Sequence, residues 1–174
     1  TRATLQFVAL YAWCSNGTRF ATVSDRGICV HDAASFELVR PPFAAAQNPT
    51  GARCALSPRG DQVCAMVNSS LLRCWSVETG RVLWSLDRVS AFANHAARQR
   101  VLVVCRGVLQ ETDWGDAPTV DLAPDCDDVG ELVSGAREIA FAWRAQRKAI
   151  DVVHLDRRQI LQSIAMSTTS HWLS

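Results

Sequence analysis

The stretch SPRGDQVCAMVNSSLLRCWSVETGRVLWSL, residues 57–86, alternates polar turns with short apolar segments. Within those segments apolar residues recur at every second position or occur as β-branched and aromatic runs, which is typical of half-buried β-strands. The intervening Ser, Pro, Gly, Asn and Thr residues favour the tight reversals that join antiparallel strands. The stretch therefore predicts one unit of antiparallel β-structure, in which one strand ends at Trp75 and one more short strand follows the next turn.

The same pattern occurs upstream in SNGTRFATVSDRGICVHDAASFELVR, residues 15–40. When the two copies are aligned, the first turns are offset by 43 residues and the strand ends by 44 residues. Two weaker copies follow downstream. The four strand ends, spaced 39–44 residues apart, are His31, Trp75, Trp114 and His154. A recurring period of this length indicates a repeat architecture.

A period of roughly 40–45 residues with this density of strands resembles the WD-repeat β-propeller family, whose repeats each form a four-stranded blade. The resemblance covers residues 8–164 and is most specific in the first two copies. It implies an all-β fold in which residues 1–174 form one segment of a propeller, an incomplete ring of about four blades. The expected blades span residues 8–40, 52–86, 89–122 and 132–166, and an acidic inter-blade loop spans 116–131.

The copies depart from the family's Trp-Asp ending and read His31-Asp32, Trp75-Ser76, Trp114-Gly115 and His154-Leu155. The resemblance places Asp25 at the family's turn aspartate, and Ser69 replaces it in the next copy. In the family this aspartate joins a turn to His, Ser and Trp side chains, so that network can be complete in one blade at most. The expected structural repeat positions are Asp25, His31, Ser69, Trp75, Trp114 and His154.

Two features leave alternatives open. Residues 78–84, ETGRVLW, resemble the quinoprotein propeller motif, in which a Thr-Gly turn leads to a docking Trp, although the motif occurs once. Residues 137–166 contain neither Gly nor Pro, and their apolar residues fall near helical spacing, so a helix is arguable. The β-rich runs 139–143 and 150–155, together with the repeat period, favour strands in this segment.

The composition bounds the function. The chain has 174 residues, 20% of them charged, and a net charge of +1, which argues against a general electrostatic grip on nucleic acid or on anionic lipid. No apolar run approaches the roughly 20 residues that span a bilayer.

The seven cysteines lack CxxC or zinc-site spacing and lie mostly in apolar runs. They indicate buried thiols and an intracellular, reducing compartment, either the cytoplasm or the nucleus, with an organelle not excluded.

No motif in the sequence indicates a catalytic activity. There is no nucleophile elbow, phosphate-binding loop or dinucleotide fingerprint, and Lys148 is the only lysine. We therefore expect no enzyme activity, no small-molecule substrate, and no catalytic, cofactor-binding or metal-binding residues. The acidic run 121–131 lacks EF-hand spacing, and its role is left open between a solvated loop and a partner contact through Asp125, Asp127 and Asp128.

Four basic residues in predicted turns are expected to share one rim of the ring, namely Arg98, Arg100, Arg147 and Lys148. Such an arc could contact phosphates or an acidic partner. The sequence, through its family resemblance, thus predicts a non-enzymatic scaffold, a protein-interaction subunit of a multiprotein or ribonucleoprotein assembly. The alternatives are an RNA-contacting propeller subunit that uses the basic rim and, less favoured, a quinoprotein-like enzyme.

Overall fold

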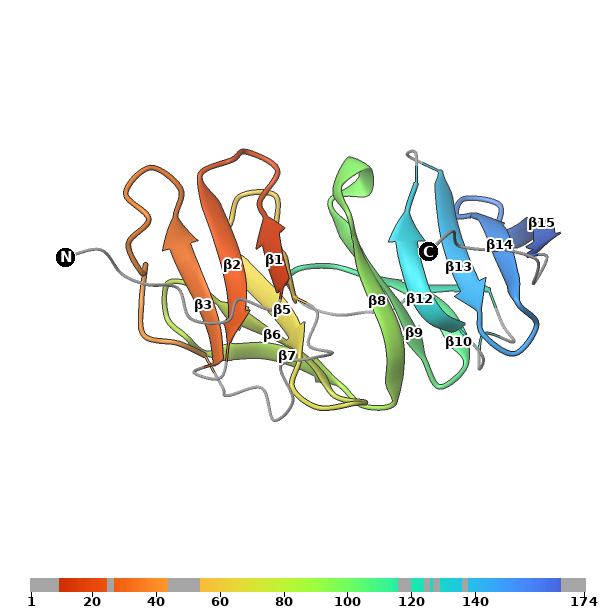
Figure 1. Ribbon diagram of the computed structural model, residues 1–174, viewed down its shortest axis with the longest axis horizontal. Helices are drawn as coiled ribbons and strands as arrows, with labels where there is room; N and C mark the ends of the chain where they lie inside the picture. Colours follow the sequence, from red (N-terminus) through yellow and green to blue (C-terminus); the bar gives the residue numbers. More distant parts are fainter. Residues whose placement is uncertain are drawn as a thin grey trace, which may run out of the picture. The chain divides into compact units, whose positions relative to one another are not determined.

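The computed structural model describes residues 10–24, 27–43, 54–115, 120–123, 126, 129–135 and 138–166. These residues form β-strands, one short 3-10 turn and no α-helix (Figure 1). The predicted all-β class is therefore confirmed. The segment for which a helix was also arguable forms three antiparallel strands, β13 (Ile139–Arg144), β14 (Ala149–His154) and β15 (Gln159–Ala165).

The strands build four antiparallel sheets in chain order. The first sheet contains β1 (Leu10–Trp13), β2 (Arg19–Ser24) and β3 (Gly27–Asp32). The second contains β4 (Cys54–Leu56), β5 (Gln62–Met66), β6 (Leu72–Ser76) and β7 (Val82–Leu86). The third contains β8 (Val89–His95), β9 (Arg100–Cys105), β10 (Val108–Thr112) and β11 (Val120–Ala123). The fourth contains β12 (Val129–Ser134), β13, β14 and β15.

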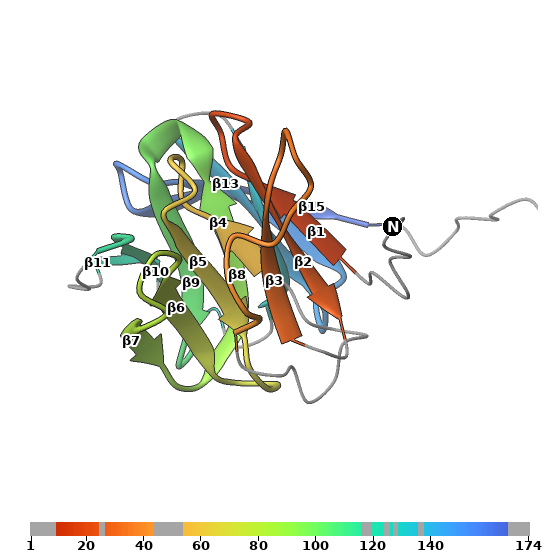
Figure 2. The same cartoon turned by 90° about the vertical axis from the view of Figure 1, so that its left-hand side faces the viewer.

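These sheets belong to two compact units. Unit 1 comprises residues 1–89 and 113–118 and holds the first and second sheets, whose strands are labelled in Figure 2. Unit 2 comprises residues 90–112 and 119–174 and holds the third and fourth sheets. Each unit has its own apolar core.

The core of unit 1 lies between one face of the first sheet and one face of the second. Because side chains alternate along a strand, every second residue of each strand points into this core. The first sheet contributes Ala21, Val23, Ile28 and Val30, and the second contributes Leu56, Val63, Ala65, Trp75 and Val77. Full burial of each large aliphatic side chain contributes about 1.5–3 kcal/mol to the stability of the unit.

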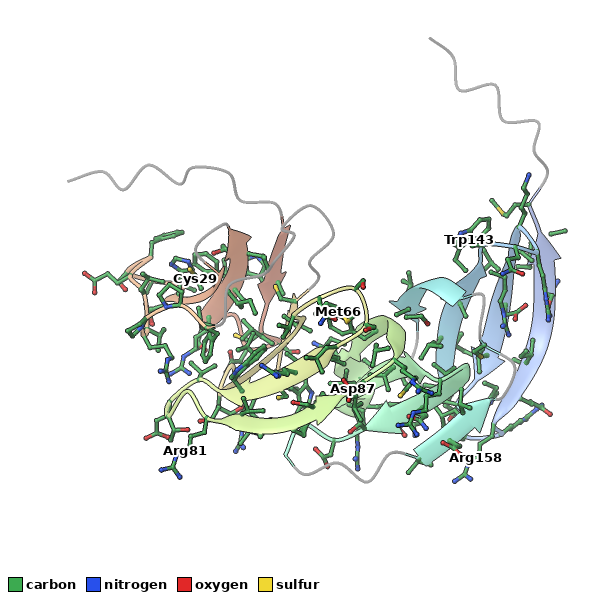
Figure 3. The ribbon with its side chains drawn as sticks, turned by 90° about the horizontal axis from the view of Figure 1, so that it is seen from below. Cys29, Met66, Arg81, Asp87, Trp143 and Arg158 are labelled. Atoms are coloured by element: carbon green, nitrogen blue, oxygen red, sulfur yellow. The ribbon has the colours of Figure 1, made fainter. Side chains whose placement is uncertain are left out.

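A tight turn between β6 and β7 is held by an arginine from the segment that follows the first sheet. The guanidinium of Arg40 lies 5.0 Å from the centre of the Phe43 ring, and its Nη1 donates to the Val77 carbonyl at 3.4 Å. Gly80 adopts φ +72°, a left-handed conformation that favours glycine, and a Cβ at this position would displace the guanidinium end of the Arg40 side chain. The neighbouring Arg81 extends away from the turn (Figure 3).

Unit 2 combines an apolar core with a buried ion pair. Its core joins third-sheet residues such as Leu102 and Leu109 to fourth-sheet residues such as Ala142 and Val153. In the fourth sheet, Arg144 Nε lies 2.6 Å from Asp151 Oδ2, and both side chains are almost completely buried. The Ser163 hydroxyl donates to the other carboxylate oxygen of Asp151, which links β15 to the pair. Buried charges persist in proteins when they are paired in this way.

Candidate functional site

One face of the first sheet carries a row of four side chains in register across the strands. Trp13 on β1 pairs with Phe20 on β2, and Phe20 pairs with His31 on β3. An isolated bridge then pairs His31 with Leu38 in the following segment. This row lies on the face of the sheet opposite to the core of unit 1, because its strand positions alternate with the core residues.

The rings of this row are packed on one another. The Phe20 and His31 rings are stacked, with centroids 4.8 Å apart and planes 9° apart, and Trp13 lies 5.0 Å from Phe20. Phe36 approaches Phe20 edge-on at 5.8 Å. Such aromatic pairs contribute about 0.5–1.5 kcal/mol each beyond the area they bury.

Exposure divides this cluster into a buried base and an exposed top. Phe20 and His31 are only 8% and 7% exposed, whereas Trp13 is 51%, Leu38 50% and Phe36 67% exposed. We call Trp13, Phe36 and Leu38, together with the Phe20 and His31 rings beneath them, the aromatic surface. Exposed apolar side chains that cluster in this way, rather than singly, are typical of interaction sites.

A hydrogen bond fixes the histidine at the base of the aromatic surface. The Thr22 hydroxyl on β2 and the His31 Nε2 on β3 lie 3.1 Å apart, and both side chains are buried. The bond holds the imidazole plane parallel to the Phe20 ring. The exposed rings therefore rest on a fixed support.

The most exposed ring is held on a strained turn. Phe36 adopts φ +60°, a left-handed conformation that costs a non-glycine residue about 1–3 kcal/mol. The turn is tied by Asp32, whose Oδ1 accepts hydrogen bonds from the backbone N–H groups of Ala34 at 3.0 Å and Ser35 at 2.9 Å. The Phe36 N–H donates to the Asp32 carbonyl at 2.9 Å. These hydrogen bonds fix the position of the Phe36 ring on the turn.

The edge of the aromatic surface carries charged groups. The backbone N–H of Ser35 and then that of Ala34 hold the pKa of Asp32 below its ordinary value of 3.8, so its carboxylate is ionised at neutral pH. Glu37, beside Phe36 in the chain, is also exposed. Arg19 lies opposite Asp32 in the β2–β3 register, and its positive charge also acts on the Asp32 carboxylate, while its Nη1 donates to the Gly60 carbonyl at 2.8 Å. The arrangement offers apolar rings beside two carboxylates and one guanidinium.

Two of the expected repeat positions occupy equivalent places in unit 1. His31 and Trp75 are the penultimate residues of β3 and β6. Trp75 is 4% exposed and points toward the first sheet, where it lies 5.8 Å from Phe43. His31 points away from the second sheet. Trp75 thus faces the sheet before its own, and His31 faces away from the sheet after its own, so the two side chains lie on corresponding faces of successive sheets.

The third repeat position, Trp114, lies beyond its strand. β10 ends at Thr112, and residues 113–118 belong to unit 1, where the Trp114 carbonyl accepts hydrogen bonds from the indole of Trp84 at 3.1 Å and from the Cys74 thiol at 3.8 Å. Trp114 is 5% exposed, and its own Nε1 has no partner within the part of the chain that is described.

The remaining expected repeat positions are His154, Ser69 and Asp25. His154 is the last residue of β14, and the penultimate residue, Val153, is the one that points into the core of unit 2. The equivalent of His31 and Trp75 is therefore Val153, one residue earlier. Ser69 is exposed in its turn, and neighbouring Asn68 makes the ordering hydrogen bonds by accepting from the N–H of Leu71 at 2.8 Å and that of Ser70 at 2.9 Å. Asp25 lies outside the described residues.

The four basic residues do not form one arc. Arg98 Nη1 lies 2.5 Å from Asp156 Oδ1, which places the β8–β9 turn beside the β14–β15 turn. Arg147 and Lys148 lie in the β13–β14 turn, at the other end of β14. Because β14 has six residues, this turn is on the order of 20 Å from the β14–β15 turn that Arg98 contacts. Arg100 begins β9 and so lies at the Arg98 end. The prediction of a shared rim is corrected to two separate pairs, because successive turns of an antiparallel sheet lie at alternate ends.

Arg98 is also engaged within the chain. Its Nε lies 2.7 Å from Glu111 Oε1, and Glu111 is largely buried. Hydrogen bonding to Glu111, and to a smaller extent to Asp156, raises the pKa of the Arg98 guanidinium. Its side chain therefore joins the third and fourth sheets of unit 2. Contacts of Arg98, Arg100, Arg147 or Lys148 with a partner or with RNA stay a prediction.

The acidic segment is only partly described. Strand β11 occupies residues 120–123 of the expected loop, and β12 (Val129–Ser134) begins inside it and continues beyond its end at residue 131. Between them Cys126 is buried, and its N–H donates to the Gly107 carbonyl at 2.6 Å. Asp125, Asp127 and Asp128 lie outside the described residues, so their role stays a prediction. Among the residues with described positions, no group of three or more His, Cys, Asp or Glu side chains could hold a metal ion.

Sequence reasoning missed the aromatic surface. Trp13 and Phe36 both lie in the first expected blade, residues 8–40, and neither belongs to a motif. The sequence holds one signal for this surface. Trp13 and Phe36 are large aromatic residues at positions that do not belong to the apolar alternation of the core face. Their exposure depends on pairings across four segments, which no local pattern shows.

Comparison with known proteins gives the class of fold. No family model matches the chain, and no curated protein matches it. A solved nidogen/laminin complex contains a chain that matches 90% of this chain over 62% of its own length, with 8% identity and a TM-score of 0.64. Dihydro-heme d1 dehydrogenase NirN, solved in complex with DHE, matches 90% of this chain over 36% of its own length, with 18% identity and a TM-score of 0.67.

The four antiparallel sheets in chain order, with these neighbours, define the fold as that of a β-propeller. The chain spans less than two thirds of the length of either matched chain. Among the described residues, no helix is long and apolar enough to cross a membrane.

Proposed function

We propose that this chain is a non-enzymatic protein-interaction module of a larger assembly, and that it binds a protein partner through the aromatic surface. The observation that carries the proposal is the pair of aromatic rings Trp13 and Phe36, each more than half exposed, above the buried Phe20–His31 stack. A soluble domain gains no stability from leaving such rings in water, whereas a partner that covers them gains their apolar area.

The chemistry of the surface indicates which partner segment fits. The rings offer apolar contact and a π-face to a cation, and the carboxylates of Asp32 and Glu37 lie in the same turn as Phe36. A segment that carries arginine or lysine beside apolar residues would satisfy both features. An acidic segment would face like charges at the edge of the surface.

We propose further that the propeller is of the WD-repeat kind. The support is the Thr22–His31 hydrogen bond, because His31 stands at the family's Trp position, the family's network includes Trp and Ser side chains, and Thr22 offers a hydroxyl as Ser does. The equivalent placement of His31 and Trp75 in their strands also supports the proposal. The matched nidogen/laminin structure is a complex between proteins, which is consistent with an interaction role for this fold.

The absence of enzyme activity and a reducing, intracellular location belong to the same proposal. The first rests on the lack of catalytic motifs in the sequence. The second rests on the seven cysteines, none of which forms a disulfide. The quinoprotein-like alternative gains little support: the Trp84 indole of its single motif copy donates to the Trp114 carbonyl, and the motif is not repeated.

A peptide selection tests the binding proposal. Random peptides displayed on phage are selected on the chain, and the enriched peptides are measured by isothermal titration against the chain and against a Trp13→Ala, Phe36→Gly double variant. We expect enriched peptides that pair arginine or lysine with apolar residues, and binding at least about tenfold weaker to the double variant, since loss of one hot-spot ring commonly costs that much.

The matched control is Val82→Ala, which removes an apolar side chain that is 48% exposed on β7 of the same unit but outside the aromatic surface. Its binding should equal that of the unsubstituted chain. Peptides that bind the double variant as tightly as the unsubstituted chain, or a selection dominated by acidic peptides, would show that the surface or its partner chemistry is wrongly assigned.

A further inference from the structure

The fourth sheet of unit 2 is apolar on both of its faces. One face lies in the core of unit 2, to which it contributes Ala140, Ala142 and Val153. The opposite face, which we call the outer face, carries large apolar side chains that pair with one another across the four strands, namely Val133, Phe141, Trp143, Ile150, Val152 and Ile164. An antiparallel sheet with water on one side normally carries polar residues there, so this composition is that of a sheet covered on both faces.

The side chains of the outer face are nevertheless accessible to water. Val133 is 50%, Phe141 38% and Ile164 42% exposed, and Trp143, labelled in Figure 3, is half-buried. None of them belongs to the core of unit 2. Because these exposed side chains are contiguous across neighbouring strands, the outer face has the character of a contact surface.

Both units repeat one mode of sheet packing. The second sheet turns the face that holds Trp75 toward the first sheet, and the fourth sheet turns the face that holds Val153, the equivalent position, toward the third sheet. Two faces have no counterpart within their own unit, namely the His31 face of the first sheet, which carries the aromatic surface, and the outer face of the fourth sheet. They are of the two kinds that pack together inside each unit, so copies of the chain are complementary to one another.

The packing inside unit 1 also indicates which ends of these two faces would meet. Arg40, in the segment that follows β3, donates to the Val77 carbonyl in the turn that follows β6 at 3.4 Å. The segments after the third strands of successive sheets therefore lie at one edge. A first sheet that packs on a fourth sheet in the same manner brings the turn after β3 close to the turn after β14.

The charged groups of these two turns are complementary. At the edge of the aromatic surface the carboxylates of Asp32 and Glu37 outnumber one guanidinium. The turn after β14 carries the exposed Arg157 and Arg158, and its own carboxylate is already paired with the third sheet. Glu138, at the same edge, lies 3.3 Å from an imidazole nitrogen of the fourth sheet. Opposite charges at the edges of two apolar faces favour their association and fix its orientation.

From these observations we propose that the aromatic surface of one copy of the chain packs on the outer face of the fourth sheet of a second copy. The pairing rests on the proposed function, because it names the partner of the aromatic surface. Two such contacts, related by a two-fold axis, close the assembly at two copies. The two copies supply eight sheets, four from each, which lies within the range of roughly four to eight blades in closed propellers.

The masses of variants that are altered on one face test the pairing. Mass is measured by light scattering after size exclusion and by sedimentation over a range of concentrations, and we expect a species of twice the 19.1 kDa chain mass. The Trp13→Ala, Phe36→Gly variant and the Phe141→Lys variant should each dimerise at least about tenfold more weakly. An equimolar mixture of the two should associate again, because one contact of the mixed pair joins two unaltered faces.

A second substitution and a matched control guard against loss of the fold. Ile164→Lys alters the outer face from a different strand and should weaken dimerisation as Phe141→Lys does. Ile160→Lys changes a residue of the same strand that is 40% exposed but pairs with Val153 of the core face, so this variant should dimerise like the unsubstituted chain. Circular dichroism of all variants should match that of the unsubstituted chain.

The outcomes separate the pairing from other arrangements. A single chain mass at every concentration overturns it, as does a dimer that persists in both Phe141→Lys and Ile164→Lys, or growth beyond two copies. Normal dimerisation of the Trp13→Ala, Phe36→Gly variant also overturns it and would mean that two outer faces pack on each other. When selected peptides bind the aromatic surface of a chain that stays monomeric, the pairing is overturned while the proposed function stands.

Discussion

Arg144 and Asp151 form an ion pair whose atoms lie 2.6 Å apart while the two side chains are only 1% and 2% exposed. Removing one partner leaves a buried charge without its counter-charge, which costs about 3–5 kcal/mol. We therefore predict that Asp151→Ala lowers the free energy of unfolding of unit 2 by about this amount in urea titrations. The control is Arg59→Ala, which breaks the exposed pair with Asp61 and should change stability by less than about 1 kcal/mol. Equal effects of both changes would contradict the structural role of the buried pair.

Two substitutions of Phe36 should separate the cost of its left-handed backbone from the contribution of its ring to peptide binding. Phe36→Gly and Phe36→Ala both remove the ring, but only glycine adopts φ +60° without strain. We predict that the glycine variant is about 1 kcal/mol more stable to urea than the alanine variant, although glycine is normally the less stable choice. Both variants should lose affinity for selected peptides. A less stable glycine variant would mean that residue 36 is not held in the left-handed conformation.

The turn that carries Phe36 should depend on pH through Asp32. The pKa of this carboxyl is lowered in the folded chain, so its contribution is present above the ordinary value of 3.8 and is lost as the pH falls through the folded value. We predict that carbon-detected NMR titration of Asp32 gives a midpoint below 3.8. The amide exchange of Ala34 and Ser35 should quicken over the same pH range. In Asp32→Ala both amides should exchange quickly at every pH, and an unchanged pattern would exclude the capping role.

Two tryptophans of unit 1 should respond differently to the same substitution. Trp75 is 4% exposed in the core between the first and second sheets, whereas Trp13 is 51% exposed on the outer face. We predict that Trp75→Ala costs about 3–5 kcal/mol of stability, as expected for a large buried ring. Trp13→Ala should cost clearly less than Trp75→Ala, because about half of the Trp13 side chain is already in water and its ring only tilts against Phe20. Chemical denaturation followed by far-UV circular dichroism measures both.

Cysteine reactivity should report the folding of unit 1. Burial raises the pKa of the Cys54 and Cys74 thiols to about 12 and that of Cys64 well above its ordinary value of 9.0. Because the thiolate is the reactive form, we predict that these three residues resist iodoacetamide at pH 8 in the native chain and react after unfolding. Mass spectrometry of digested samples locates the label. Rapid native labelling of Cys64 would contradict the burial of the second sheet.

The alternation of residues and the recurring period were sufficient to predict the sheets. Strands β3 and β6 end at Asp32 and Ser76, one residue beyond His31 and Trp75, because both repeats carry clear turn residues on either side. In the weaker fourth repeat, the sequence predicted His154 where the structure has Val153. The sequence of β14 is AIDVVH, and the charged Asp151 is buried in it, so the alternation of apolar residues does not indicate which face of the strand is in the core. One residue of error in a strand moves a side chain to the opposite face.

The candidate site depended on information that local sequence does not hold. The basic residues were grouped by the assumption that all turns share a rim, whereas antiparallel connection sends alternate turns to opposite ends of a sheet. The aromatic surface requires Trp13, Phe20, His31 and Leu38 to pair in one register across three connections. Phe36 could not be recognised because its left-handed backbone follows from the Asp32 turn and not from the propensity of phenylalanine.

The position of Trp114 has a consequence for synthesis of the chain. Its carbonyl is the acceptor for the Trp84 indole and the Cys74 thiol of the second sheet, and it is separated from β7 by the whole of β8, β9 and β10. During translation the second sheet can assemble its strands as they leave the ribosome, but these donors stay unsatisfied until residue 114 has emerged. A fragment that ends at Val89 never acquires this acceptor. Such a truncated product should therefore be bound by chaperones and degraded by proteases more readily than the chain that includes residue 114.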